Sequence, residues 1–222
     1  KSVSKYTRNK DDIKYYAQEL KENTYNLTRM NLVMRGIKPD NIFTRCGDTL
    51  EQDWPMYDDE THEYKFVQLD AVVSNPPYSQ HWDPSHKDTD PRYRYGIAPK
   101  GKADYAFLLH DLYHLRPGGV MAIVLPHGVL FRGDALGGSD SQGEGEGRIR
   151  RNLIENNNIE AIIGLPANIF FGTGIPTIIM VLRQKREASD VLFIDASKGF
   201  TKVGKNNKLM ASHIKRIVDA FA

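Results

Sequence analysis

The sequence predicts an α/β fold with a doubly wound, mostly parallel sheet, and two features of its hydrophobic pattern indicate that class. Short apolar runs of strand length alternate along the chain with longer segments whose apolar residues recur at helical spacing. One run, residues 120–125, is apolar at every position, which is typical of a strand in a sheet that is buried on both faces. Strands that alternate with helices are joined by right-handed crossovers, so their carboxyl ends are expected to meet at one edge of the sheet.

The first predicted elements are a strand, a helix and a second strand. Residues 13–20 form a strand that ends in Glu19, and residues 41–50 form a short strand that leads to Asp48 at a turn. Between them, residues 21–36 are predicted to form a helix that stops at a glycine. Its apolar residues share one face at helical spacing, and they are Leu27, Met30, Val33 and Met34.

After an acidic, loop-like stretch at residues 51–65, the apolar run 69–73 is predicted to be a buried strand that leads into an asparagine, two prolines and a tyrosine. Proline cannot donate to a sheet ladder, so the strand ends at about Asn75. A residue before proline is held extended, so the Asn75 side chain projects past the carboxyl end of the strand, where open α/β sheets bind ligands. The order of the strands predicts that Glu19, Asp48 and Asn75 lie on this same edge.

The Asn-Pro-Pro-Tyr tetrapeptide offers hydrogen-bond acceptors and an aromatic face that suit the amino group of a planar base. Such an amino group is a poor nucleophile because its lone pair is delocalised into the ring. The side-chain oxygen of Asn75 and the carbonyl of Pro76, held rigid by Pro77, are predicted to accept its two hydrogens and free the lone pair, with no metal required. Tyr78 is predicted to stack on the base. The alternative is a strand end followed by an ordinary turn, and the tetrapeptide alone leaves both open.

The long connection at residues 79–102 interleaves basic residues with aromatics, which favours a loop that faces nucleic acid over an ordinary solvated insertion. Residues 103–116 form a predicted helix that ends before a Pro-Gly-Gly stop. In this helix His110 and His114 are four residues apart, but no third metal ligand is nearby in the sequence, so surface or flanking histidines are predicted. The aromatics of the connection are Trp82, Tyr93 and Tyr95.

The second half of the chain contains a glycine-rich stretch, residues 133–147, that is predicted to be a flexible loop. Its G-x-G-x-G pattern follows no strand, and its glutamate spacers would repel a phosphate. Two later strands, joined through residues 166–176, are predicted to form a closing antiparallel pair, and no internal repeat or domain break is evident. The other predictions are a helix at 148–157, strands at 160–165, 177–182 and 191–195, and a helix at 209–221.

The composition is that of an ordinary soluble globular protein, with 40% hydrophobic and 26% charged residues in a chain of 222. The net charge of +2 is far from the basic footprint of a stand-alone nucleic-acid binder. One cysteine, Cys46, excludes a disulfide framework and suits a reducing cytosol. No apolar run reaches membrane-spanning length, and residues 1–12 lack the apolar region of a signal peptide.

Long stretches between about Tyr16 and about Val218 closely resemble one known family. They are AQELKENTYNLTRMNLVMRGI, GDTL, VVSNPPYS, YGIAPKGKADYAFLLHDLYHL, MAIVLPHGVLFRG, IRRNLIE, IIGLPANIFFGTGIPT, VLFIDASK and the closing NKL and HI. The family is the modification subunit of bacterial type I restriction–modification systems, a DNA adenine-N6 methyltransferase. The resemblance implies an S-adenosylmethionine-dependent, Rossmann-like methyltransferase fold in a bacterial cytoplasmic enzyme. It also implies double-stranded DNA, a specificity subunit and a restriction subunit as partners.

The resemblance also implies roles for single residues. Glu19 matches the acidic residue that holds the cofactor ribose hydroxyls, and Asp48 matches a residue near the cofactor adenine. Asn75, with the two prolines and the tyrosine that follow it, matches the catalytic tetrapeptide, with Asn75 also next to the cofactor. Phe171 matches the region whose aromatic packs against the flipped target base, although Phe170 remains an alternative. The implied mechanism is direct displacement, in which the amino nitrogen of a flipped adenine attacks the sulfonium methyl in line.

One expected feature of the family is absent before residue 13. This feature is the first strand with the glycine-rich cofactor loop that it carries, of the type Asp-Pro-x-Cys-Gly-Ser-Gly. The helical N-terminal region and the C-terminal region of the family are missing too. That strand lies centrally, between the strands that end at Glu19 and Asn75, so its loss predicts unpaired edges and weak cofactor binding. Residues 1–222 are therefore predicted to be a partial catalytic domain.

Three functional interpretations follow from this sequence. The first is a methyltransferase module that is complete only with its upstream segment. The second is a non-enzymatic remnant that binds DNA or partner subunits. The third, methylation of RNA or of protein glutamine, shares the Asn-Pro-Pro-Tyr chemistry but fits the long type I similarity less well.

Overall fold

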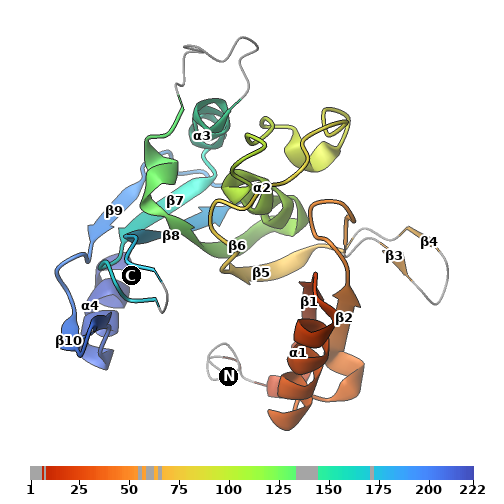
Figure 1. The fold of residues 1–222 in the computed structure, drawn as a ribbon, viewed down its shortest axis with the longest axis horizontal. Helices are drawn as coiled ribbons and strands as arrows, with labels where there is room; N and C mark the ends of the chain where they lie inside the picture. The colour runs from red at the N-terminus through yellow and green to blue at the C-terminus, as the bar shows by residue number, and fades with distance from the viewer. Residues whose placement is uncertain are drawn as a thin grey trace. The chain divides into compact units, whose positions relative to one another are not determined.

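The computed structural model describes residues 7, 9–54, 57–58, 63–64, 67–133, 145–170 and 173–222 (Figure 1). The chain divides into two compact units, residues 1–67 and 68–222. Each unit is built around its own sheet. Among the described residues, no helix has both the length and the apolar character needed to cross a membrane. The prediction of one catalytic domain over 1–222 stays a prediction.

The first unit is a strand–helix–strand with a parallel pair of strands. β1 (Tyr15–Glu19) pairs in parallel with β2 (Ile42–Cys46), and α1 (Glu22–Met34) connects them. The ring of Tyr16 stacks on that of Phe43 across the pair, with centroids 4.8 Å apart. These elements confirm the three that the sequence predicts at 13–50. The acidic stretch 51–65, which the sequence predicts to be a loop, also contains a short antiparallel hairpin of β3 (Tyr57–Asp58) and β4 (Glu63–Tyr64). Two short 3-10 helices lie earlier in the chain, at Lys10–Asp12 and Pro39–Asn41.

The apolar face of α1 is exposed in the described structure. The four residues of this face, Leu27, Met30, Val33 and Met34, each expose more than half of their surface, and the helix has no buried residue. A helix of this length gains little stability without a buried face. The predicted helix and its apolar face are therefore confirmed, but this face is not buried against any of the described residues.

The second unit contains a five-stranded sheet in the order β5-β6-β8-β7-β9. β8 is antiparallel to both of its neighbours, and the other neighbouring pairs are parallel. The carboxyl ends of β5, β6, β7 and β9 therefore lie at one edge, and the predicted antiparallel pair β7–β8 is confirmed. The strands are β5 (Leu69–Ser74), β6 (Leu115–Pro126), β7 (Ile159–Gly164), β8 (Thr177–Arg183) and β9 (Leu192–Asp195), with a hairpin of β10 (Thr201–Val203) and β11 (Asn206–Lys208).

Helices lie on both faces of this sheet (Figure 1). α2 (Asp104–His114) and α3 (Glu146–Glu155) lie on one face, and α4 (Ala211–Phe221) lies on the other. α3 begins before the predicted residue 148, and most of the predicted glycine-rich loop, 134–144, lies outside the described residues. Two further 3-10 helices occupy Pro91–Tyr93 and His127–Leu130. The fully buried residues Met121, Ile123, Leu125, Ile178, Met180 and Leu182 share the face opposite the one packed against Ile217 of α4, because they alternate along β6 and β8.

The prediction that β5 is a buried strand is wrong, because β5 lies at the edge of its sheet. Val73 exposes 76% of its surface, and β5 pairs only with β6 among the described strands. β1 likewise pairs only with β2. The strand that the sequence predicts between β1 and β5 stays a prediction.

Candidate active site

The tetrapeptide follows β5 directly at the carboxyl edge of the sheet. β5 ends at Ser74, Pro76 is buried beneath the turn, and Asn75 and Pro77 are exposed. The hydroxyl of Tyr78 donates a hydrogen bond of 2.9 Å to Oδ1 of Asn75. The end of the strand and the exposed Asn75 side chain are thus as predicted. The structure adds that the Asn75 side-chain oxygen already accepts a hydrogen bond from Tyr78 of the same tetrapeptide.

A second aromatic ring meets Tyr78 from the connection between β7 and β8. The rings of Tyr78 and Phe170 lie edge to face, with centroids 6.4 Å apart and planes at 73°. Burial, and then the nearby carboxylate of Asp104, raise the pKa of the Tyr78 hydroxyl, so it stays protonated as a donor at neutral pH. Phe171 lies outside the described residues, so its predicted contact with a target base stays a prediction.

Two acids of α2 bind the residues on either side of the tetrapeptide. On one side the side chain of Asp111 is hydrogen-bonded to Ser74, and burial raises the pKa of Asp111 to about 7 although this hydrogen bond lowers it. On the other side Oδ1 of Asp104 accepts from the backbone N–H of Ser79 at 2.8 Å. Ser79 has a φ of +51°, a conformation that costs free energy in a residue with a side chain. α2 thus fixes both flanks of the tetrapeptide.

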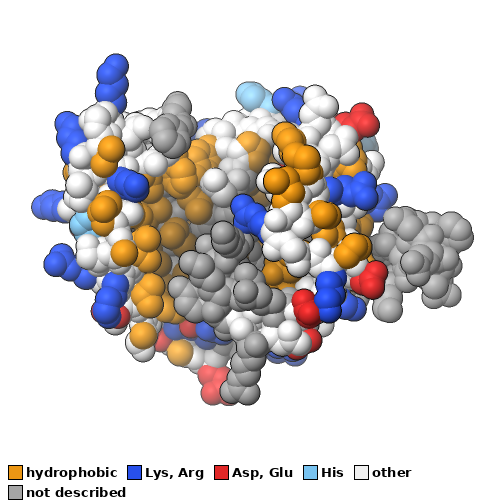
Figure 2. Space-filling view, turned by 90° about the horizontal axis from the view of Figure 1, so that it is seen from below, with side chains coloured by type: hydrophobic (Ala, Val, Ile, Leu, Met, Phe, Trp, Pro, Cys, Tyr) orange, Lys and Arg blue, Asp and Glu red, His pale blue; other side chains and the backbone are white. Residues whose placement is uncertain are grey.

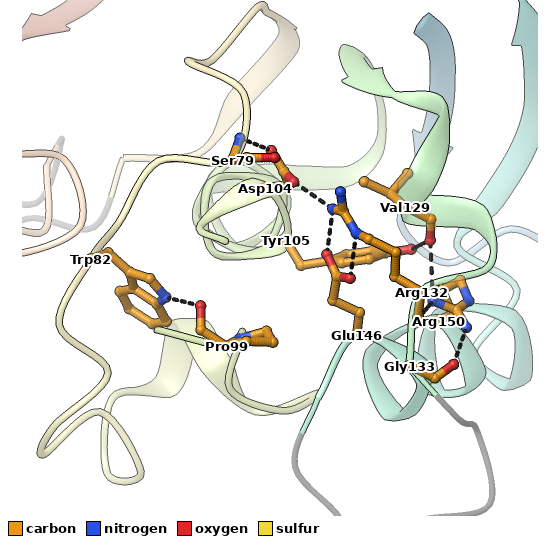
Figure 3. Close-up of polar contacts among 10 residues, drawn as sticks. All are labelled: Ser79, Trp82, Pro99, Asp104, Tyr105, Val129, Arg132, Gly133, Glu146 and Arg150. Carbon is orange, nitrogen blue, oxygen red and sulfur yellow. Dashed lines mark hydrogen bonds and ion pairs between the residues drawn. The ribbon is translucent and has the colours of Figure 1, made fainter. Parts of the chain in front are cut away.

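Asp104 is part of a buried charge network (Figure 3). Arg132 donates from Nη2 to Oδ2 of Asp104 at 2.5 Å. It also donates to Glu146, the first residue of α3, from Nε at 2.7 Å and from Nη2 at 2.6 Å. Asp104 is 0% and Glu146 3% exposed, so the guanidinium compensates two buried carboxylates at once. The start of α2, the segment after β6 and the start of α3 are joined at this point.

A second arginine extends the same network along the segment after β6 (Figure 3). Arg150 donates from Nη1 to the carbonyl of Val129 and from Nη2 to that of Gly133, both at 3.1 Å. The hydroxyl of Tyr105 donates to the same Val129 carbonyl at 2.9 Å. These bonds satisfy carbonyls of the 3-10 helix and the turn after β6, and they join this segment to α2 and α3.

Sequence reasoning missed Asp104, Asp111, Arg132 and Glu146 as parts of the site. A carboxylate within a mostly apolar helix was the available signal for Asp111. No comparable signal exists for Arg132, because its partners lie 28 and 14 residues away along the chain.

The prediction of surface or flanking histidines in α2 is wrong. His110 and His114 are both buried, because α2 turns this side toward the interior of the unit. Nδ1 of His110 lies 3.1 Å from Nη1 of Arg92, whose guanidinium also binds both carboxylate oxygens of Asp90. Burial, with His114 and Arg92 adding to it, lowers the pKa of His110, so the ring is neutral and accepts from the arginine.

The connection at residues 79–102 does not present its aromatics as predicted. Trp82 and Tyr93 are buried with ring centroids 5.3 Å apart, and Nε1 of Trp82 donates to the carbonyl of Pro99 at 3.0 Å (Figure 3). The part of the prediction that used these two rings to bind bases is therefore wrong. Tyr95 is partly exposed, and the guanidinium of Arg94 lies 4.9 Å from its ring centroid.

The two predicted cofactor carboxylates lie in the first unit, at the carboxyl ends of β1 and β2. Glu19 is the last residue of β1, and its Oε1 accepts from the Thr28 hydroxyl at 3.4 Å. Asp48 follows β2, and its Oδ1 accepts from the backbone N–H of Leu50 at 2.9 Å. The parallel register puts both residues at the same end of this sheet, as predicted. Their position relative to Asn75, in the other unit, stays a prediction.

Comparison with known proteins gives consistent matches. The family model described as N-6 DNA Methylase matches residues 1–222. The type I restriction enzyme MpnII methylase subunit of Mycoplasma pneumoniae is 39% identical over 217 residues, which are 94% of this chain and 38% of that protein. The solved methyltransferase subunit of a type I restriction–modification system from Streptococcus thermophilus is 45% identical, with a TM-score of 0.88, and the match covers 99% of this chain and 44% of that one.

A more distant solved structure agrees in fold alone. It is a putative class I S-adenosylmethionine-dependent methyltransferase from Listeria monocytogenes, 16% identical with a TM-score of 0.59, covering 95% of this chain and 55% of that one. These matches confirm the predicted methyltransferase fold class. The chain spans less than half the length of the Mycoplasma and Streptococcus relatives.

Proposed function

Because this chain belongs to the N-6 DNA methylase family, we propose that it is the catalytic part of a DNA adenine-N6 methyltransferase of a type I restriction–modification system. It would transfer a methyl group from S-adenosylmethionine to a flipped-out adenine in double-stranded DNA, with specificity and restriction subunits as partners in the bacterial cytoplasm. The observation that carries the proposal is the pairing of an exposed amide, Asn75, with the rings of Tyr78 and Phe170 at one strand end.

In this proposal the tetrapeptide acts through geometry. Oδ1 of Asn75 and the carbonyl of Pro76 accept the two amino hydrogens of adenine, which makes its nitrogen lone pair available for attack. Pro77 limits the rotation of that carbonyl. The hydroxyl of Tyr78 leaves Oδ1 of Asn75 when the base enters, and its ring stacks on the base beside Phe170.

The cofactor carboxylates fit the role proposed for them. S-adenosylmethionine, when bound, supplies an electrophilic methyl group on its sulfonium sulfur. The Glu19 carboxylate has about four lone-pair sites, of which the long bond from Thr28 uses one, so it can accept two ribose hydroxyls. Asp48 is oriented by its bond to the Leu50 N–H, which fixes the turn on which the cofactor adenine would rest.

The methylated nucleoside that the protein produces tests the proposed function. The chain, and in parallel a longer form extended upstream of residue 1, are incubated with methyl-tritiated S-adenosylmethionine and duplex DNA, and the DNA is digested to nucleosides. We expect the label in N6-methyldeoxyadenosine. Label in a methylated cytosine, or in RNA or protein glutamine supplied in place of the DNA, would contradict the proposal. DNA binding without label from either form would favour the non-enzymatic remnant, which the unpaired edges of β1 and β5 among the described strands make the second candidate.

Two substitutions of Tyr78 separate its ring from its hydroxyl. Tyr78→Phe keeps the stacking face and removes the donor that competes for Oδ1 of Asn75, so kcat/KM is expected to equal the wild-type value or exceed it by up to about 5-fold. Tyr78→Ala removes the stacking, worth about 1–3 kcal/mol, so kcat/KM is expected to fall about 5- to 150-fold. A Phe variant that loses as much as the Ala variant would show that the hydroxyl, not the ring, carries the function.

A further inference from the structure

The β10–β11 hairpin lies against the β7–β8 connection, which carries Phe170 of the aromatic pair. It follows β9, whose carboxyl end shares the sheet edge with that of β5. Asn207 of β11 fastens it to the connection that carries Phe170. Its backbone N–H donates to the carbonyl of Asn168 at 2.9 Å, and its Nδ2 donates to the carbonyl of Ala167 at 2.8 Å. The hairpin is therefore tied to the segment whose Phe170 lies beside the position proposed for the flipped base.

This part of the chain concentrates positive charge. Residues 196–222 contain six of the 30 basic residues and one of the 28 acidic residues, so the rest of the chain carries 24 basic against 27 acidic residues. The single acid, Asp219, is paired with Lys215 of α4 at 2.6 Å. Figure 2 shows Lys and Arg side chains along the left side of the view, where Figure 1 places α4 and β10. The hairpin itself exposes Lys202, Lys205 and Lys208.

We infer that this hairpin is a contact surface for DNA phosphates beside the target adenine. The inference rests on the proposed function for the identity of the polymer. Lysine ammonium groups bind phosphates as mobile point charges, which positions a duplex without reading its sequence. A duplex whose adenine is rotated into the turn after β5 must present its flanking phosphates at this sheet edge. A short, exposed, lysine-rich hairpin held against the Phe170 connection is suited to that task.

The test is the salt dependence of DNA binding by the 222-residue chain, followed by fluorescence anisotropy of a labelled duplex. The hairpin variant is Lys202→Gln, Lys205→Gln and Lys208→Gln together. The matched control removes three exposed charges elsewhere, by Lys21→Gln, Arg35→Gln and Lys185→Gln. The slope of log K against log salt should fall by about 0.9 for each hairpin lysine that neutralises a phosphate, so by up to about 2.7 in the hairpin variant. The control should leave the slope near the wild-type value.

The outcomes separate this inference from the proposed function. Equal slopes in the hairpin variant and the control, or no binding of duplex DNA by the wild-type chain, would overturn the inference. Equal lysine-dependent binding to phosphatidylserine vesicles would also overturn it, because a general anionic surface would then be the partner. A chain that binds duplex DNA through these lysines but never forms N6-methyldeoxyadenosine would contradict the proposed function and leave the hairpin contact standing.

Discussion

Replacement of Arg132 by methionine is expected to lower the free energy of unfolding of residues 68–222 by about 3–5 kcal/mol. Its guanidinium lies 2.5 Å from a carboxylate oxygen of Asp104 and 2.6 Å from one of Glu146. Both acids are buried, so the variant leaves two carboxylates without their cation in a medium that solvates them poorly. The loss should also free the turn at Ser79, which Asp104 holds through the backbone N–H.

The two tryptophans allow the measurement to be confined to one unit. Trp54 belongs to the first unit and Trp82, which is buried, belongs to the second. In a Trp54→Phe background, urea unfolding followed by tryptophan fluorescence reports on the second unit alone. The control is Arg151→Met, because Arg151 pairs with Glu155 on an exposed helix face and should contribute little to stability.

Removal of the buried charges should reverse the effect. The triple variant Arg132→Met, Asp104→Asn, Glu146→Gln keeps similar volumes and leaves no carboxylate in this network, so it should recover most of the lost stability. The asparagine side chain that replaces Asp104 in that variant would still offer an oxygen to the N–H of Ser79. If Arg132→Met changed the unfolding midpoint no more than Arg151→Met, the network would be contributing little to the fold.

Local chemistry explains what could be predicted from the sequence. The prolines after Asn75 end β5 whatever lies around them, so the exposed amide at the strand end follows from two residues alone. The parallel strands, the antiparallel β7–β8 pair and the positions of Glu19 and Asp48 in their own unit follow in the same way from apolar runs and turn residues.

The errors concern burial, which depends on packing between distant parts of the chain. An apolar run such as β5 has the same sequence pattern in the centre of a sheet as at its edge, so the exposure of Val73 was not predictable from it. His110 and Trp82 carry polar atoms that usually reach water, and their burial depends on single partners, Arg92 and the Pro99 carbonyl, that no local pattern identifies.

Replacement of Asn75 by alanine is expected to lower kcat for adenine methylation by about 10²- to 10³-fold, the size usually seen when one preorganised polar group at a reacting centre is removed. The variant removes an acceptor and little else, because the side chain is exposed and its oxygen is held by the Tyr78 hydroxyl of the same turn. The measurement is single-turnover methyl transfer in the shortest form of the protein that yields N6-methyldeoxyadenosine. Stability and DNA binding should match the wild type.

Asn75→Asp is the matched control, because it keeps an acceptor oxygen at the same position and changes only the charge and the second group. If Asn75 acts by accepting an amino hydrogen, the Asp variant should retain more activity than the Ala variant. The hydroxyl of Tyr78 can donate to the oxygen of either Asn or Asp, so the comparison tests the acceptor in the same surroundings. An Ala variant within about 3-fold of wild type would mean that the Pro76 carbonyl activates the amino group alone. Equal, large losses in both variants would instead assign Asn75 a role as a donor through its amide NH2, since that is the group both substitutions remove.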